Sequence, residues 1–479
     1  MKIILVAGAR PNFMKIAPII SAIKAHNSKI EESSEERDNL FLKDVFLEKP
    51  ETGNRQLAAN KEYFKKSGVI ERLEPIKHIL IHTDQHYDND MSDIFFEHLS
   101  LLKPDIHLKV GSASHAVQTA EIMKRFERSL LNERPDVVVV VGDVNSTIAC
   151  ALVASKIDYR DSGCKMQDSG YTMIDQKKQK SRLWPLNSGL SGQRPLIAHV
   201  EAGLRSFDRT MPEEINRILT DQLSDFLFTT EESANQNLRK EGIPEEKIFF
   251  VGNTMIDTLL THHKRAQKSK ILQKLGLVNS SHNSSNPPNS IKRYAVLTLH
   301  RPSNVDDKKT FKSILEALFH ISSRIPIILP THPRTLNRIK EFNFGRYFEG
   351  FPPDNCQPAI GNCGIHCVKP LGYLDFLCLM SHATLVLTDS GGIQEETTIL
   401  GIPCITLREN TERPVTITEG TNVIVGSDGK KIIKESYKVL EGNFKKGKTP
   451  KLWDGKAAKR IVDIISSNLK SSANHRFTP

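Results

Sequence analysis

The sequence contains no apolar run long enough to cross a bilayer. Its longest runs, such as Val137–Val141, are far shorter than the roughly 18 residues that a membrane-spanning helix requires. The first apolar run, Ile3–Ala7, is too short for the hydrophobic region of a secretory signal and has no cleavage site after it. We therefore expect a cytoplasmic protein that does not insert into a membrane.

Cysteine is scarce and its spacing shows no pairing logic. Seven cysteines among 479 residues are an odd number for a disulfide framework, so we expect reduced thiols. The group Cys356, Cys363, His366 and Cys367 has the spacing C-x6-C-x2-H-C and lacks the second half of a zinc site. We therefore predict no metal there.

Positive charge is concentrated at one end of the chain. The net charge is +10, and residues 430–479 hold 13 Lys and Arg against 4 acids, which leaves +9 in this segment. Aromatic side chains do not alternate with these lysines in the way that single-strand nucleic-acid binders use them. We therefore interpret the segment as a solvated helix face and a basic tail, and predict no nucleic-acid partner.

Short apolar runs alternate with stretches of helical period along most of the chain. After Ile3–Ala7, for example, Ile16, Ile19, Ile20 and Ile23 form one stripe of a helix. Such alternation is typical of α/β proteins with parallel sheets, and the length suits two doubly wound, Rossmann-like domains that face a cleft. We predict an N-terminal domain over residues 1–252 with inserts near 27–75 and 156–194, and a C-terminal domain over 253–455. Residues 456–479 would form a helix and a basic tail that pack back on the first domain.

Polar side chains gather where the predicted strands end, which is where such sheets bind ligands. Gly8 to Lys15 follow the first strand, and Arg10 and Lys15 beside a helix N-terminus suit an anion. Asp143, Glu201 and Glu213 follow later strands and would serve as an acid/base set. An alternative interpretation of the same residues is structural: Asp143 would cap a helix, and Glu213 would complement a helix dipole.

The second half ends its strands in a comparable way. Ser390, Gly391 and Gly392 would let backbone N–H groups approach a diphosphate, and a Glu one turn later would accept hydrogen bonds from a ribose. Neither a Walker loop nor Gly-x-Gly-x-x-Gly is present. The set is completed by three further groups, any of which would also suit a structural role: His300-Arg301-Pro302, His332-Pro333-Arg334 and Glu412-Arg413-Pro414.

Taken together, these motifs resemble the series found in non-hydrolysing UDP-N-acetylglucosamine 2-epimerases. The matching segments occur in the family's order: Gly8–Lys15, Gly142-Asp143, His199–Arg205, Pro212–Arg217, Gly252–Thr254, His300-Arg301, Asp389–Glu396 and Thr411–Pro414. They cover nearly the whole chain apart from the predicted inserts. The resemblance implies a GT-B-like fold and interconversion of UDP-N-acetylglucosamine and UDP-N-acetylmannosamine by elimination and re-addition of UDP, which would supply precursors for surface polysaccharides.

The resemblance also implies roles for individual residues. By this resemblance, the catalytic residues are Asp143, Glu201, Glu213 and His300. The residues that bind the UDP-sugar are Arg10, Lys15, His332, Ser390, Gly391, Gly392, Glu396 and Arg413. No metal or nicotinamide cofactor is implied. A homodimer is expected on the resemblance alone.

Two segments depart from the family pattern. Ala9 and Asn12 stand where many members have Thr and Glu, a variation also seen in members that act on UDP-diacetamido-uronic acids. Gln85 and His86 lie in a segment that resembles the allosteric UDP-N-acetylglucosamine contacts of bacterial members, with Asp84 where Gly is usual. The alternatives are therefore an epimerase of such a related UDP-sugar, a hydrolysing 2-epimerase, a GT-B glycosyltransferase, or a non-catalytic UDP-sugar-binding protein.

Overall fold

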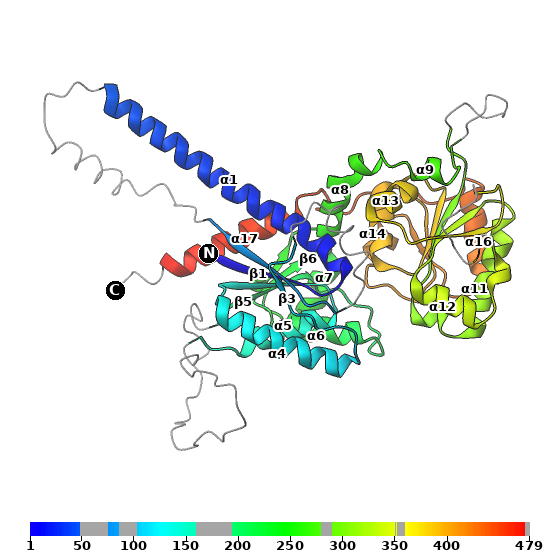
Figure 1. Ribbon diagram of the computed structural model, residues 1–479, viewed down its shortest axis with the longest axis horizontal. Helices are drawn as coiled ribbons and strands as arrows, with labels where there is room; N and C mark the ends of the chain where they lie inside the picture. The colour runs from blue at the N-terminus through cyan, green and yellow to red at the C-terminus, as the bar shows by residue number, and fades with distance from the viewer. Residues whose placement is uncertain are drawn as a thin grey trace, which may run out of the picture.

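The computed structural model describes residues 1–47, 75–85, 103–159, 194–278, 290–349, 351 and 360–474 (Figure 1). Within the first predicted insert, helix α1 (Arg10–Leu47) continues to Leu47, and residues 48–74 lie outside the described residues. The greater part of the second insert also lies outside them. None of the described helices is both long and apolar enough to cross a membrane.

The first half of the chain forms one parallel seven-stranded sheet. Its strands are β1 (Lys2–Ala7), β2 (Lys77–His82), β3 (Ile106–His107), β4 (Val137–Val141), β5 (Leu196–Ala202), β6 (Phe226–Thr229) and β7 (Ile248–Phe250). They lie in the order β3-β2-β1-β4-β5-β6-β7. Side chains of β1 alternate between two buried clusters, Ile3 and Leu5 on the side of α1, and Ile4 and Val6 on the opposite side. The sheet is therefore covered on both faces.

A second parallel seven-stranded sheet follows. Its strands are β8 (Ala295–Thr298), β9 (Ile327–Pro330), β10 (Phe348–Glu349), β11 (Ile365–Val368), β12 (Leu385–Thr388), β13 (Cys404–Thr406) and β14 (Asn422–Ile424). They lie in the order β10-β11-β9-β8-β12-β13-β14. The predicted fold class of two doubly wound α/β units is confirmed.

Helices connect the strands in both halves. The first half contains α1, α4 (His115–Glu133), α5 (Asn145–Lys156), α6 (Pro212–Leu223) and α7 (Glu232–Lys240), and α8 (Thr254–Ala266) leads into the second. The second half contains α9 (Ile271–Lys274), α10 (Pro302–Val305), α11 (Lys308–Ser322), α12 (Pro333–Glu341), α13 (Tyr373–Ser381), α14 (Gly391–Leu400), α15 (Val415–Thr418) and α16 (Gly429–Leu440). Short 3-10 turns occur at Glu245–Lys247 and Gly345–Tyr347. In Figure 1, α4, α5 and α6 lie on the face of the first sheet opposite α1.

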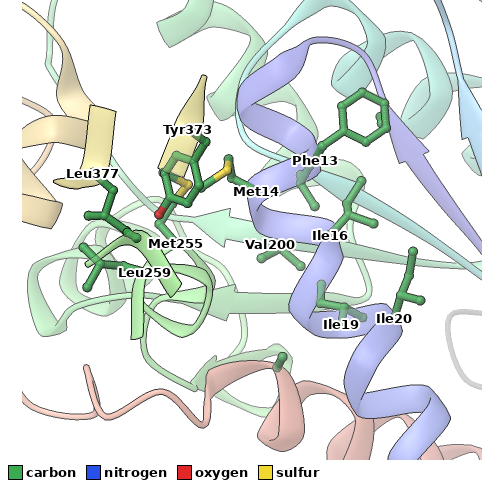
Figure 2. Close-up of a cluster of buried hydrophobic side chains, with 14 of the residues drawn as sticks. Phe13, Met14, Ile16, Ile19, Ile20, Val200, Met255, Leu259, Tyr373 and Leu377 are labelled. Carbon is green, nitrogen blue, oxygen red and sulfur yellow. The ribbon is translucent and has the colours of Figure 1, made fainter. Parts of the chain in front are cut away.

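The apolar stripe predicted for the first helix is buried. Figure 2 shows Ile16, Ile19 and Ile20 of α1 directed toward the first sheet, and Met14 close to the residues of α8 and α13. The Thr258 hydroxyl of α8 donates a hydrogen bond to the Met14 carbonyl at 2.5 Å. Helix α8 thus joins the buried cores of the two halves.

The end of the chain returns to the first half. Helix α17 (Ala457–Asn474) packs against α1 and α8 (Figure 1). Its first turn donates backbone hydrogen bonds from Ala457 and Ala458 to the Asp257 carboxylate, at 3.2 and 2.7 Å. Just before it, the buried Trp453 donates its indole N–H to the Thr230 carbonyl at 2.8 Å. These contacts fix the position of the C-terminal helix on the first half.

Candidate active site

A cleft of about 970 Å³ lies between the carboxyl ends of the two sheets, which is within the usual range for small-molecule sites. Residues of both halves line it. The first half contributes Gln85, Asp143, Asn145, Asp208 and Glu213, and the second half contributes Arg301, Arg334, Arg408 and Glu409, among others. One wall is therefore rich in carboxylates and amides, whereas the other carries three guanidinium groups.

The turn after β1 places a lysine beneath this cleft. The Asn12 side-chain oxygen accepts hydrogen bonds from the N–H groups of Gly8 and Ala9, at 3.0 and 2.8 Å. One helical turn later, Lys15 Nζ lies 2.5 Å from Glu201 Oε2, and both side chains are buried. A Cβ atom on Gly142 would lie 2.9 Å from Lys15 Nζ, so glycine leaves room for this ion pair.

Glu201 has an unusual backbone conformation. Its φ is +71°, a region that L-residues other than glycine rarely adopt. The β5–β6 pairing shifts register between Val200 and Ala202, so Glu201 occupies a bulge that redirects its side chain. Its Oε1 atom is buried and has no hydrogen-bond partner among the described residues. Backbone strain and an unpaired polar atom of this kind are typical of functional sites.

Asp143 follows β4 and is held by an arginine of α6. Arg217 donates a hydrogen bond to Asp143 Oδ2 at 2.5 Å and another to Glu214 Oε2 at 2.7 Å. The Asp143 side chain remains 27% exposed, so one edge of the carboxylate faces the cleft. Burial raises the pKa of Asp143, but the charges of Arg217 and Lys15 outweigh burial and hold the pKa below its usual value. Asp143 is therefore ionised at neutral pH.

A buried histidine supports the loop that carries Asp143. His199 on β5 has Nδ1 2.6 Å from Asp221 Oδ1 and Nε2 2.8 Å from the Gly142 carbonyl. The imidazole ring is therefore held by an oxygen atom at each of its two nitrogens. Burial raises the pKa of Asp221, but His199 and Arg205 lower it by more, so the carboxylate stays charged. His199 thus fixes the carbonyl next to Asp143.

In the second half, Asp389 organises the loop after β8. Its Oδ2 accepts hydrogen bonds from the N–H groups of His300 and Arg301, at 2.9 and 2.8 Å. His300 Nδ1 lies 2.9 Å from Asp389 Oδ1, and its side chain is 38% exposed. The His332 ring centroid lies 5.4 Å from that of His300. The two predicted histidines are therefore neighbours.

Arg413 occupies the junction of the two halves. Its guanidinium contacts Glu395 Oε1 and Glu412 Oε1, both at 2.6 Å, and lies 3.5 Å from Glu201 Oε2 of the first half. A Cβ atom on Gly391 would lie 2.7 Å from Arg413 Nη1, so glycine permits this close approach to the first turn of α14. The guanidinium thus lies against the N-terminal turn of α14, paired with carboxylates from both halves.

Glu396 directly follows Glu395 on α14 but lies in a different environment. The Tyr373 hydroxyl donates to Glu396 Oε1 at 3.2 Å, and both side chains are buried. Burial raises the pKa of Glu396 to about 8, although the hydrogen bond from Tyr373 lowers it in part. Glu396 is thus protonated at neutral pH, unlike Asp143.

The structure brings the predicted site residues together in three groups. Gln85, Asp143 and Glu213 line the cleft. Behind them lie Lys15, Glu201 and Arg413, followed by Ser390, Gly391 and Gly392 at the start of α14. His300 and His332 form the third group, and Glu396 stands apart beside Tyr373. The Arg10 side chain and His86 lie outside the described residues.

Several residues that shape this site were not assigned a role from the sequence. Arg217 and Glu412 are the most important of them, since Arg217 holds Asp143 and Glu412 pairs with Arg413 and Arg408. Both lie inside the motifs that carried the resemblance. Arg217 lies 74 positions from Asp143, so spacing alone did not predict that contact, whereas Arg408 and Arg413 are close to Glu412 in sequence.

The family model for UDP-N-acetylglucosamine 2-epimerase matches residues 69–160 and 192–466. The chain belongs to the UDP-N-acetylglucosamine 2-epimerase family. The resemblance inferred from the motifs is thus confirmed, and the chain is an isomerase of this family.

Two relatives and one solved structure illustrate this membership. The UDP-N-acetylglucosamine 2-epimerase of Methanocaldococcus jannaschii is 42% identical over 86% of this chain and 97% of its own. That of Methanococcus maripaludis is 38% identical over 86% and 98%. A crystal structure of the M. jannaschii enzyme in complex with UDP-GlcNAc and UDP has a TM-score of 0.70 at 37% identity, with 98% of this chain and 100% of that chain covered.

Proposed function

We propose that this enzyme interconverts UDP-N-acetylglucosamine and UDP-N-acetylmannosamine without net hydrolysis. The observation that carries the proposal is the pair of carboxylates, Asp143 and Glu213, on one wall of a cleft whose other wall carries Arg301, Arg334 and Arg408. The names of the relatives and the ligands of the M. jannaschii structure support the same substrate. They favour it over a related UDP-uronic acid.

The reaction needs groups of both kinds. No carbonyl neighbours C2 of the sugar, so its proton becomes removable as the C1–O bond breaks and positive charge develops at C1. A base takes the C2 proton, the C1–C2 double bond forms, and the electrons of the C1–O bond leave with UDP. Returning a proton to the other face of C2 and UDP to C1 completes the epimerisation. Two proton-transfer groups and a cationic diphosphate site are therefore required.

The carboxylates supply the proton transfers. Asp143 and Glu213 serve jointly as base and acid, because removal and return of the C2 proton occur on opposite faces of the sugar. Glu201 does not line the cleft and acts through Lys15, whose ammonium group lowers the pKa of Asp143. Of the three predicted acid/base residues, Asp143 and Glu213 thus face the substrate, whereas Glu201 holds Lys15 close to Asp143.

The second half binds the leaving group. Ser390, Gly391 and Gly392 present backbone N–H groups at the start of α14, and Arg413 lies against them. His300, fixed by Asp389, directly precedes Arg301, which lines the cleft. These groups neutralise the diphosphate as the C1–O bond breaks. His332 and Glu396 of the second half, and Arg10 and Lys15 of the first, belong to the same predicted UDP-sugar-binding set.

The remaining assignments extend the proposal to the whole molecule. The first domain spans residues 1–252 and the second 253–455, with 456–479 returning to the first. The enzyme acts in the cytoplasm and supplies precursors for surface polysaccharides. Gln85 lines the cleft and accepts a hydrogen bond from the Ser146 hydroxyl at 2.7 Å. Together with His86, it forms the proposed allosteric segment.

A homodimer is supported by apolar side chains left on the surface of α4 and α6. Val117 is 55% exposed, Leu219 48% and Ile215 38%. A second hollow of about 560 Å³ lies between these helices and is lined in part by Ile215 and Met123. Exposed apolar groups of this kind mark association surfaces. Sedimentation velocity should therefore give twice the chain mass for the wild type, and Leu219→Glu should shift the protein toward monomer.

Proton NMR of the purified protein with UDP-N-acetylglucosamine in deuterated water tests the reaction. We expect UDP-N-acetylmannosamine with deuterium at C2, without accumulation of free sugar. Free N-acetylmannosamine and UDP would instead identify a hydrolysing enzyme. Absence of exchange, with UDP still bound, would contradict the proposal and direct the experiment to UDP-diacetamido-uronic acids.

A further inference from the structure

Two histidines and one aspartate meet at the end of β2, beside the cleft but outside the residues that line it. Strands β2 and β3 pair in parallel with His82 opposite His107, so these side chains project from the same face of the sheet. Asp84 lies two positions after His82, beyond the end of β2, and its carboxylate reaches both imidazoles. Strand register therefore brings the two histidines together, and the turn after β2 adds the aspartate.

The three side chains direct their polar atoms toward one point. His82 Nδ1 lies 2.6 Å from Asp84 Oδ1, and His107 Nδ1 lies 3.2 Å from both oxygens of the same carboxylate. One ligand atom from each residue can be chosen so that all lie within 4.8 Å of one another. Two imidazole nitrogens and a carboxylate oxygen in this arrangement are a ligand set of zinc and other first-row divalent ions.

The surrounding backbone holds the aspartate in place. Asp84 has a φ of +55°, which is unfavourable for a residue with a Cβ atom. Its Oδ2 accepts the Lys109 N–H at 3.0 Å, and its carbonyl accepts the Gly111 N–H at 2.9 Å. The second carboxylate oxygen is thereby left for the imidazoles.

We propose that His82, Asp84 and His107 bind one divalent transition-metal ion, with Zn²⁺ as the probe of choice, and leave a coordination position for solvent. His107 is 43% exposed, which gives an ion access from solvent. The ion would fasten the end of β2 to β3, one residue before Gln85 enters the cleft wall. This departs from the expectation of no metal that the family resemblance gave.

Zinc titration of the metal-stripped full chain tests the proposal, with a phosphine reductant to keep the thiols reduced. His107→Gln removes one ligand, and Asp84→Gly removes another while suiting the positive φ. His320→Gln is the matched control, because His320 is an exposed histidine on α11, far from β2 in sequence and in another sheet. We expect the wild type and the control to bind one more Zn²⁺ than either ligand variant, or to bind it at least tenfold more tightly.

Cobalt substitution gives a second readout that does not depend on activity. Co²⁺ bound to two imidazoles and a carboxylate would produce visible d–d absorption in the wild type and in His320→Gln, and this absorption would be lost in the two ligand variants. Zn²⁺ should also raise the thermal midpoint of the wild type more than that of the variants. Equal zinc stoichiometry, affinity and cobalt spectra in all four proteins would overturn the proposal and leave a purely hydrogen-bonded His–Asp–His cluster.

Discussion

Lys15 Nζ lies 2.5 Å from Glu201 Oε2, and the two side chains are 9% and 2% exposed. The pair joins the first turns of α1 to the bulge that ends β5, directly behind the cleft. A buried ion pair contributes little net stability, but removal of one partner leaves the other charge buried and less well compensated. Breaking the pair should therefore destabilise the fold, and keeping it holds the positive charge of Lys15 near Asp143.

Replacing Lys15 tests this relationship. Lys15→Met should lower the free energy of unfolding by about 3–5 kcal/mol, because Glu201 is left buried with Arg413 at 3.5 Å as its remaining cation. Urea unfolding measures the loss. The double variant Lys15→Met with Glu201→Gln removes the orphaned charge and should regain at least half of it. If the double variant loses the sum of the two single effects, the residues are not coupled.

The second prediction concerns Asp143 as a proton-transfer group. Asp143→Asn should reduce turnover by about 10²–10⁴-fold, since an amide cannot take or return the C2 proton. UDP binding, measured by calorimetry, should be largely kept because most of the proposed UDP-binding groups lie in the other half. Activity within threefold of the wild type would remove Asp143 from the mechanism.

Asp208→Asn is the matched control for that experiment. Asp208 also lines the cleft, but its carboxylate accepts the N–H and hydroxyl of Thr210 within its own loop. The control should stay within a few-fold of wild-type turnover. A loss equal to that of Asp143→Asn would show that any change of charge in the cleft impairs the enzyme.

A third prediction separates backbone strain from the position of Lys15. Gly142 and Gly111 both have a positive φ, +68° and +78°, so alanine at either position should cost about 1–2 kcal/mol. At Gly111 the new Cβ meets nothing within 4 Å, whereas at Gly142 it lies 2.9 Å from Lys15 Nζ. Gly142→Ala should therefore lose more stability in urea unfolding and should also lose turnover. Equal effects of the two substitutions would show that the Lys15 side chain moves away from the new Cβ atom without loss of stability or turnover.

The alternation of apolar runs and helical stripes predicted the two doubly wound sheets, because burial between helices leaves a direct mark on sequence. The stripe of Ile16, Ile19 and Ile20 is an example. The bulge at Glu201 left no such mark, because its φ depends on the register of β5 against β6. Nor did spacing predict the contact between Arg217 and Asp143, since 74 positions separate them.

The environment of Glu396 shows the same dependence on tertiary structure. From sequence, a Glu one turn into a helix would reach a ribose, and that role remains a prediction. The structure places this carboxyl beside the Tyr373 hydroxyl, on a helix that precedes the strand leading to α14. No local pattern encodes the tertiary surroundings of either group. Burial raises the pKa of both carboxyls, but only Asp143 has cations, Arg217 and Lys15, that outweigh it.

Glu396 therefore predicts a specific dependence of stability on pH. Its pKa is about 8 in the folded chain against a reference value of 4.5, so folding favours the protonated form. The stabilisation from this group is complete below about pH 4.5 and is lost as the pH rises through about 8. Over that range the free energy of unfolding should fall by up to about 1.4 kcal/mol per pH unit from this group.

Glu396→Gln removes the titration and nearly preserves the shape of the side chain. Urea unfolding at pH 5, 7 and 9 should show the variant gaining stability relative to the wild type as the pH rises, with the largest gain at pH 9. Glu316→Gln is the control, because Glu316 is 56% exposed on α11 and makes an ion pair with Lys312 at 3.5 Å. It should track the wild type to within about 0.5 kcal/mol at each pH. A difference between Glu396→Gln and the wild type that does not change with pH would mean that Glu396 is ionised in the folded chain.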